Sequence, residues 1–73
     1  MHNMLVIENS PNRLLREEEV LVLTGQSRTG LYMLEKAGGF PRRIKLSLNG
    51  RSVRWKNQEV LNWIDEKCSA RDV

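Results

Sequence analysis

TGQSRTGLYMLEKAGGFP, residues 24–41, contains a turn, a helix start, a two-faced helix and a helix stop in one run. Gly25 supplies the backbone freedom that a tight turn after a preceding helix requires. Ser27 is a suitable N-cap, because its hydroxyl can accept a hydrogen bond from an unpaired amide of the next turn. Gly38 and Gly39 end the helix and Pro41 prevents its resumption. The run therefore predicts the second half of a helix-turn-helix, with its helix over residues 27–38.

The predicted helix has two different faces, since successive side chains are turned by about 100°. Leu31, Leu34 and Gly38 share an apolar or small face. Any surface helix can have such a stripe, so the stripe alone does not distinguish a recognition helix from a packing helix. The opposite face carries hydrogen-bond donors and cations: Arg28, Thr29, Tyr32, Met33 and Lys36.

The segment before the turn is predicted to be the first helix of the motif. It begins near Arg16 with three glutamates, and acidic side chains favour the positive end of a helix. The run VLVL at 20–23 has strand propensity, but a strand would leave the joint at Gly25 and Ser27 without its first arm. Residues 1–12 are expected to form a mobile arm that could add an edge strand or touch DNA.

A β-hairpin is predicted after the motif. Residues 42–48 alternate, which places Ile44, Leu46 and Leu48 on a buried face and basic or polar side chains outside. Asn49-Gly50 predicts a type I′ turn, followed by a return strand over residues 51–55. Because an isolated hairpin is marginal in water, it should lie against the helices as a wing.

The last helix is expected over residues 57–70, starting at Lys56 or Asn57. The 73 residues can hold one small domain, over residues 13–70, with a short tail at 71–73. The predicted fold is α+β and mostly helical: a winged helix-turn-helix with three helices and a two-stranded hairpin. The two tryptophans are assigned to its core rather than to base stacking. The full predicted core is Val20, Leu23, Leu31, Leu34, Phe40, Ile44, Leu46, Val53, Trp55, Val60, Trp63 and Ile64.

Positive charge is concentrated in one part of the chain. The net charge is +3, but the segment 42–56 has six cations and no acid. A local basic strip beside a candidate recognition helix is typical of nucleic-acid binders, although a solvated hairpin face could also be basic. The six cations are Arg42, Arg43, Lys45, Arg51, Arg54 and Lys56.

Several other classes of protein are disfavoured. With Cys68 and His2 as the only cysteine and histidine, the chain cannot form an internal disulfide or a Cys/His metal site. No run is long enough to span a bilayer, and we expect a cytoplasmic protein without a cofactor. The carboxylates at residues 17–19 lack an accompanying nucleophile and base, so an enzyme is not expected.

The chain resembles the AlpA family of phage and prophage regulatory proteins, whose small domains are similar to the winged helix-turn-helix of the MerR group and of phage excisionases. The similarity runs from about Arg13 to Lys67. It rests on the order and spacing of Glu19-Val20, Thr24-Gly25, Ser27-Arg28-Thr29, Leu31-Tyr32, Leu34, Gly38, Phe40-Pro41, Ile44, Leu46, Arg51, Val53, Trp55, Glu59-Val60 and Trp63-Ile64.

The resemblance implies a DNA-binding protein of an integrated element, acting on integrase transcription, on excision, or on both. It implies recognition positions at Arg28, Thr29, Tyr32 and Met33, with Arg51 in the wing. Three departures stand out: Gly30 replaces a frequent serine or threonine, Met33 a frequent basic residue, and the connection at 47–50 is longer than usual.

The predicted helix, the basic strip and the family resemblance together give the complete set of predicted DNA contacts. The helix is expected to enter the major groove, and the wing to contact the backbone or the minor groove. Arg28 is expected to select the base sequence, and Arg43 to add affinity for any DNA. The set is Ser27, Arg28, Thr29, Tyr32, Met33, Lys36, Arg42, Arg43, Lys45, Asn49, Arg51 and Arg54.

The partner is therefore expected to be double-stranded DNA. Ten residues after Trp63 are too few for the coiled coil of full MerR regulators, which predicts a monomer that binds repeated sites side by side. An excisionase that bends attachment-site DNA is one alternative function. A second is an adaptor that contacts integrase through residues near Asp65 and Glu66.

Overall fold

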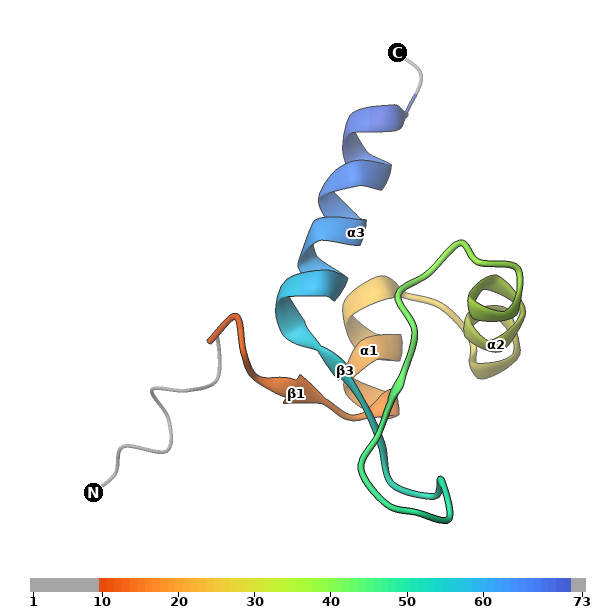
Figure 1. Cartoon of the computed structure of the whole chain (residues 1–73). Helices are drawn as coiled ribbons and strands as arrows, with labels where there is room; N and C mark the ends of the chain where they lie inside the picture. The colour runs from red at the N-terminus through yellow and green to blue at the C-terminus, as the bar shows by residue number, and fades with distance from the viewer. Residues whose placement is uncertain (1–9, 72–73) are drawn as a thin grey trace.

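A computed structural model describes residues 10–71, and this part of the chain forms three helices and three short strands (Figure 1). The predicted α+β class, with three helices and a wing, is confirmed. Most of the predicted arm over residues 1–12 and of the predicted tail over residues 71–73 lies outside this range, because residues 1–9 and 72–73 are not described. The elements are β1 (Leu14–Leu15), α1 (Glu17–Thr24), α2 (Arg28–Lys36), β2 (Ile44–Lys45), β3 (Val53–Lys56) and α3 (Asn57–Ala70).

The helix-turn-helix joint forms as its residues predict. Gly25 has a φ of 73° and donates its N–H to the carbonyl of Leu21 at 2.8 Å, which ends α1 in the left-handed conformation. Ser27 caps α2, since its Oγ accepts from the N–H of Gly30 at 3.0 Å. At the start of α1, the N–H of Arg16 donates to Oε1 of Glu19 at 2.8 Å. The valines and leucines of α1 are therefore helical, because both ends of the segment are capped.

Replacing Gly25 with alanine is expected to lower the free energy of unfolding by about 1–2 kcal/mol, the cost of a left-handed L-residue. A Cβ atom at this position would meet nothing within 4 Å, so the cost comes from the backbone conformation rather than from a clash. Urea denaturation followed by circular dichroism measures the loss. Gly25→Asn should recover part of it, since asparagine adopts this conformation more readily; equal stability of Gly25→Ala and the wild type would contradict the explanation.

The strands form one antiparallel sheet in the order β1-β3-β2. Strand β1 was not predicted: its two residues are too few to show an alternating pattern, and they become a strand only by pairing with β3. Leu15 lies opposite Trp55 and is fully buried. The sheet therefore has a third strand beyond the hairpin, and Leu15 was missing from the predicted core.

The predicted burial is wrong for the first half of the hairpin, whereas Val53 and Trp55 of the return strand lie in or against the core as predicted. Ile44 is 36% exposed, Leu46 51% and Leu48 109%, because the hairpin extends past the helices (Figure 1). The turn is also not type I′, which needs positive φ at both central residues: among residues 10–71 only glycines have positive φ. Instead, the N–H of Gly50 donates to the carbonyl of Ser47 at 3.1 Å, which puts Leu48 and Asn49 at the centre of the turn.

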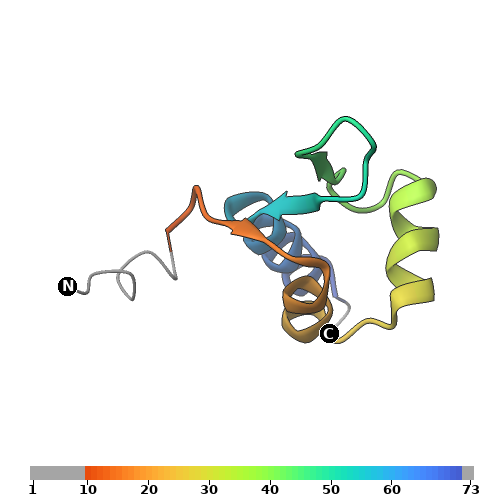
Figure 2. The same cartoon turned by 90° about the horizontal axis from the view of Figure 1, so that it is seen from below.

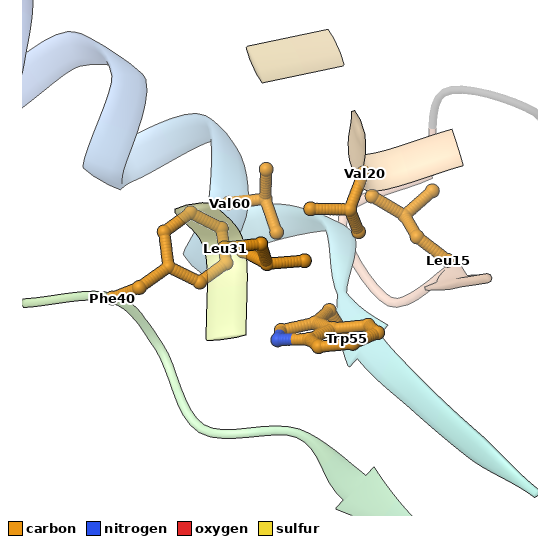
Figure 3. Close-up of a cluster of buried hydrophobic side chains, with 6 residues drawn as sticks. All are labelled: Leu15, Val20, Leu31, Phe40, Trp55 and Val60. Carbon is orange, nitrogen blue, oxygen red and sulfur yellow. The ribbon is translucent and has the colours of Figure 1, made fainter. Parts of the chain in front are cut away.

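The core lies between α1, α2, α3 and the sheet (Figure 3). The predicted core placement of both tryptophans is confirmed. Trp55 is fully buried and donates its Nε1–H to the carbonyl of Pro41 at 3.1 Å. Trp63 is partly buried, packs edge-to-face on Phe40 at 4.9 Å and donates to the carbonyl of Gly39 at 2.6 Å. The buried residues are Leu15, Val20, Leu31, Phe40, Trp55 and Val60, with Leu21, Leu34, Val53, Trp63 and Ile64 packed against them.

One other predicted core residue, Leu23, is exposed, because Val20 is the residue of α1 that faces the interior. The start of α3 is held by the segment before β1. Asn57 is buried, and its Nδ2 donates to the carbonyl of Ser10 at 3.1 Å. Its N–H donates to the carbonyl of Arg13 at 2.8 Å.

Across residues 10–71, no helix is both long enough and apolar enough to cross a membrane.

Candidate DNA-binding surface

The outer face of α2 presents all of the side chains predicted to read DNA. Arg28, Thr29, Tyr32, Met33 and Lys36 are exposed and lie within an arc of about 140° on a helix of 3.6 residues per turn. The opposite side carries Leu31, which is fully buried. Burial of Leu31 therefore orients this polar face away from the core. Figure 2 shows α2 at the right of the molecule and the loop of the wing at the top.

Two of these side chains have partners on the surface. Nε of Arg28 lies 3.4 Å from a carboxylate oxygen of Glu17, but its side chain stays 70% exposed. Such a solvated pair is weak, so Arg28 can exchange Glu17 for another acceptor. Nζ of Lys36 lies 5.8 Å from the centre of the Tyr32 ring. Ser27 at the start of α2 is already engaged, because its Oγ accepts the hydrogen bond of the helix cap.

A shallow hollow joins α2 to the basic strip. Tyr32, Glu35 and Lys36 line it from the helix, and Arg42, Arg43 and Lys45 line it from the segment that leads into the wing. Arg42, Lys45 and Arg51 are exposed. The helix face and three cations of the strip thus belong to one continuous surface, although they are separated in sequence.

Arg43 differs from the other cations of the strip because it is engaged inside the protein. Its Nη2 and Nε donate to Oε1 of Glu35 at 2.8 and 3.0 Å, and its backbone N–H donates to Oε2 at 2.7 Å. The guanidinium also lies 5.0 Å from the centre of the Trp55 ring. These contacts hold the start of the wing against α2, and we call the pair the Glu35–Arg43 clamp.

The clamp shifts the pKa of both partners. Burial alone would raise the pKa of Glu35, but the hydrogen bonds from the side chain and backbone of Arg43 outweigh it and lower the pKa below its usual 4.5. The hydrogen bond to Glu35 raises the pKa of Arg43. Glu35 is the only acid between Glu19 and Glu59, and that isolation within a basic segment was the sequence signal for it.

Two other predicted contacts are used to shape the wing. Oδ1 of Asn49 accepts from Oγ of Ser47 at 2.7 Å and from the N–H of Arg51 at 3.0 Å. Arg54 is half-buried and its Nη1 donates to the carbonyl of Val53 at 2.8 Å. The accessible donors of the surface are therefore those of α2 together with Arg42, Lys45 and Arg51.

A second, larger hollow lies between the loop at 38–44 and α3. Its lining mixes the acids Glu59 and Glu66 with the cations Arg42, Arg43 and Lys67. The hollow beside α2 has Glu35 as its one acid, and that carboxylate is paired with Arg43. Phosphate groups would meet acidic side chains there, so the hollow beside α2 matches DNA better than this larger one.

Comparison with known proteins gives two results. Residues 13–68 match the model of a family described as "Prophage CP4-57 regulatory protein (AlpA)". A protein of Enterobacteria phage P4, described as "Uncharacterized protein ORF88", is 39% identical over 59 residues. The aligned segment covers 81% of this chain and 65% of the phage protein, so the chain spans less than two thirds of that relative.

Proposed function

The chain belongs to the AlpA family of prophage regulatory proteins, and from this premise we propose that it is a sequence-specific DNA-binding protein that regulates transcription of the integrase gene of an integrated element. One observation carries the proposal: the exposed polar face of α2 is continuous with the cations Arg42 and Lys45 through one hollow. A surface of this kind supplies both base-edge donors and phosphate contacts.

In the proposed complex α2 lies in the major groove, which is wide enough to admit a helix. Arg28 leads from the N-terminal end of the helix and donates two hydrogen bonds to a guanine. Thr29 contacts a neighbouring base edge or thymine methyl group. Tyr32 and Lys36, farther along the same face, fix the register on phosphates.

The wing completes the grip on the backbone. Arg42, Lys45 and Arg51 are exposed and pair with phosphates, so that binding weakens as salt is raised. Arg43 contributes through position rather than through its charge, because Glu35 already neutralises it. This replaces the role expected for Arg43 from sequence, that of a free phosphate contact.

Direct control of excision is a second candidate for the same DNA-binding surface. The wing projects beyond the helices (Figure 1) and carries an exposed leucine, and proteins that kink DNA frequently insert apolar side chains into the minor groove. The two functions use the same contacts and differ in where the target lies: beside a promoter for regulation, or within attachment-site repeats for excision. An adaptor role toward integrase would use α3 and need no binding of naked DNA.

The direct test retains a randomised duplex pool on the purified protein at near-physiological and at higher salt, and then sequences the bound fraction. Enrichment of a short motif that salt weakens supports the proposal. Retention without a motif leaves only non-specific DNA binding, and absence of retention at both salts overturns it.

Arg28→Ala should lose about 1–3 kcal/mol of discrimination at one base pair, the value of a bidentate contact to guanine. Competition between the selected duplex and its single-base variants measures this loss. Arg42→Ala is the matched control: it removes one exposed cation, and should weaken the selected and the altered duplexes by the same factor. If Arg28→Ala kept the wild-type base preference, Arg28 would not be the base-reading residue.

A further inference from the structure

The tip of the wing carries an uncovered leucine. Leu48 has an exposed fraction of 109%, the largest among the big apolar residues of the described segment. Leu46, two residues earlier, is 51% exposed. Single apolar residues are common on protein surfaces, so exposure alone does not assign Leu48 a role.

The loop that carries Leu48 is held in one shape. The N–H of Leu46 donates to the carbonyl of Ser52 at 2.7 Å, and Oγ of Ser47 accepts from the N–H of Ser52 at 3.2 Å. The turn itself is closed by the Gly50 to Ser47 hydrogen bond and by the two contacts to Oδ1 of Asn49. These bonds use the polar groups of the loop internally and leave the Leu48 side chain projecting without contacts. Because the loop is already ordered, binding a partner costs little further conformational entropy of the loop.

The surroundings of Leu48 are cationic. Arg51 and Lys45 are exposed, and the aliphatic stem of Lys45 lies beside Gly50 of the same turn. The sequence has no acidic residue from 36 to 58. An apolar tip flanked by cations complements a narrow groove of negative potential with stacked bases at its floor, and DNA supplies both in its minor groove.

We propose that Leu48 is a wedge that enters the minor groove next to the site read by α2 and partly separates one base step, thereby kinking the DNA. The inference rests on the proposed function, because the wedge needs α2 docked in the adjacent major groove. Arg51 and Lys45 hold the phosphates on either side of the step. Pyrimidine–purine steps such as TA and CA unstack most readily, so one should lie at a fixed distance from the α2 site.

The test uses the selected duplex in two measurements, its bend by energy transfer between end labels and the fluorescence of 2-aminopurine placed at the flanking step. Wild-type protein should bend the duplex by roughly 20–90°, the range of minor-groove wedges, and brighten the probe. Leu48→Ala should bind with a smaller bend and leave the probe dim. Leu48→Ile, which keeps an apolar wedge, should restore both signals. Val22→Ala removes a comparably exposed side chain, 82% accessible on α1, and should change neither.

The possible outcomes distinguish failure of the wedge from failure of the proposed DNA-binding function. If the wild type binds no duplex, the proposed function itself fails. If the wild type binds a specific duplex without bending it, or if Leu48→Ala bends it equally, the wedge is wrong while DNA recognition stands. If Leu48→Ala bends the duplex normally but no longer forms a complex with integrase on that duplex, the tip binds a protein partner. That result would overturn the wedge.

Discussion

Trp55→Ala is expected to remove a large part of the free energy of unfolding of the protein and to lower its melting temperature strongly. Trp55 is fully buried in the centre of the sheet, between β1 and β2. Removing a buried aromatic side chain costs about 3–5 kcal/mol. The hydrogen bond to Pro41 and the contact with the Arg43 guanidinium would be lost as well.

Because the domain is small, this loss is a large part of its total stability. At about 0.05–0.15 kcal/mol per residue, the 73-residue chain has a total stability of about 4–11 kcal/mol. Far-UV circular dichroism at increasing temperature measures the outcome, and Trp63 remains as a fluorescent reporter. Trp55→Phe, which keeps a ring but not the N–H, should melt between the variant and the wild type. Melting of Trp55→Ala within about 4 °C of the wild type, equivalent to no more than about 1 kcal/mol, would contradict the assigned role.

Glu35→Gln is expected to lower the free energy of unfolding by about 1.5–3 kcal/mol, because hydrogen bonds to a charged group have about this value. The side chains of Glu35 and Arg43 are 12% and 28% exposed, so solvent screens the pair only partly. The substitution should also weaken specific DNA binding, since the clamp holds the wing beside α2. The direction of the change in DNA affinity distinguishes two roles of Glu35. If Glu35 acted only through its charge, removing this acid from a basic surface would tighten DNA binding.

The same substitution should flatten the dependence of stability on acid. The folded-state pKa of Glu35 is lowered, so the folded protein binds fewer protons than the unfolded chain as the pH falls. The stabilisation from the clamp is thus complete above the usual value of 4.5 and is lost as the pH falls from there through the folded pKa. Glu19 adds a similar loss, chiefly because the backbone N–H of Arg16 lowers its pKa.

Urea titrations at pH 7 and in the acid range measure this effect. The difference in free energy of unfolding between the two conditions should be smaller for Glu35→Gln than for the wild type. Glu18→Gln, at an exposed position of α1, serves as the matched control and should keep the wild-type difference. An unchanged difference in Glu35→Gln would show that the carboxylate is not held as described.

The features predicted from sequence are those specified by neighbouring residues. Gly25 and Ser27 determine the helix-turn-helix joint through bonds that span a few positions. The alternation of the hairpin is equally local, but whether its apolar side is covered depends on the length of the hairpin relative to the helices. Of the three leucine and isoleucine positions predicted to be buried, only Ile44 lies in β2, Leu48 lies at the centre of the turn, and all three side chains, including Leu46, are exposed.

Contacts between residues that are far apart in the sequence could not be predicted from local patterns either. Leu15 becomes a core residue only by pairing with β3, forty residues away in sequence. Arg43 looked like one more free cation, because its partner lies on the preceding helix across a loop. The outward face of α2 was predictable, whereas the division of the basic strip into structural and accessible cations required the three-dimensional arrangement.

The pairing of β1 with β3 also sets the order in which a growing chain can become active. Strand β1 can pair with β3 only after Trp55 and Lys56 have been synthesised. The carbonyl of Ser10 can accept its hydrogen bond only after Asn57 has been synthesised. A nascent chain that already contains the whole helix-turn-helix, up to Pro41, still lacks Trp55 and Val60 of its core. Such contacts between distant residues slow folding. In the proposed complex α2 can therefore bind DNA only after α3 has been synthesised, and we expect a fragment that ends at the wing neither to fold nor to bind DNA.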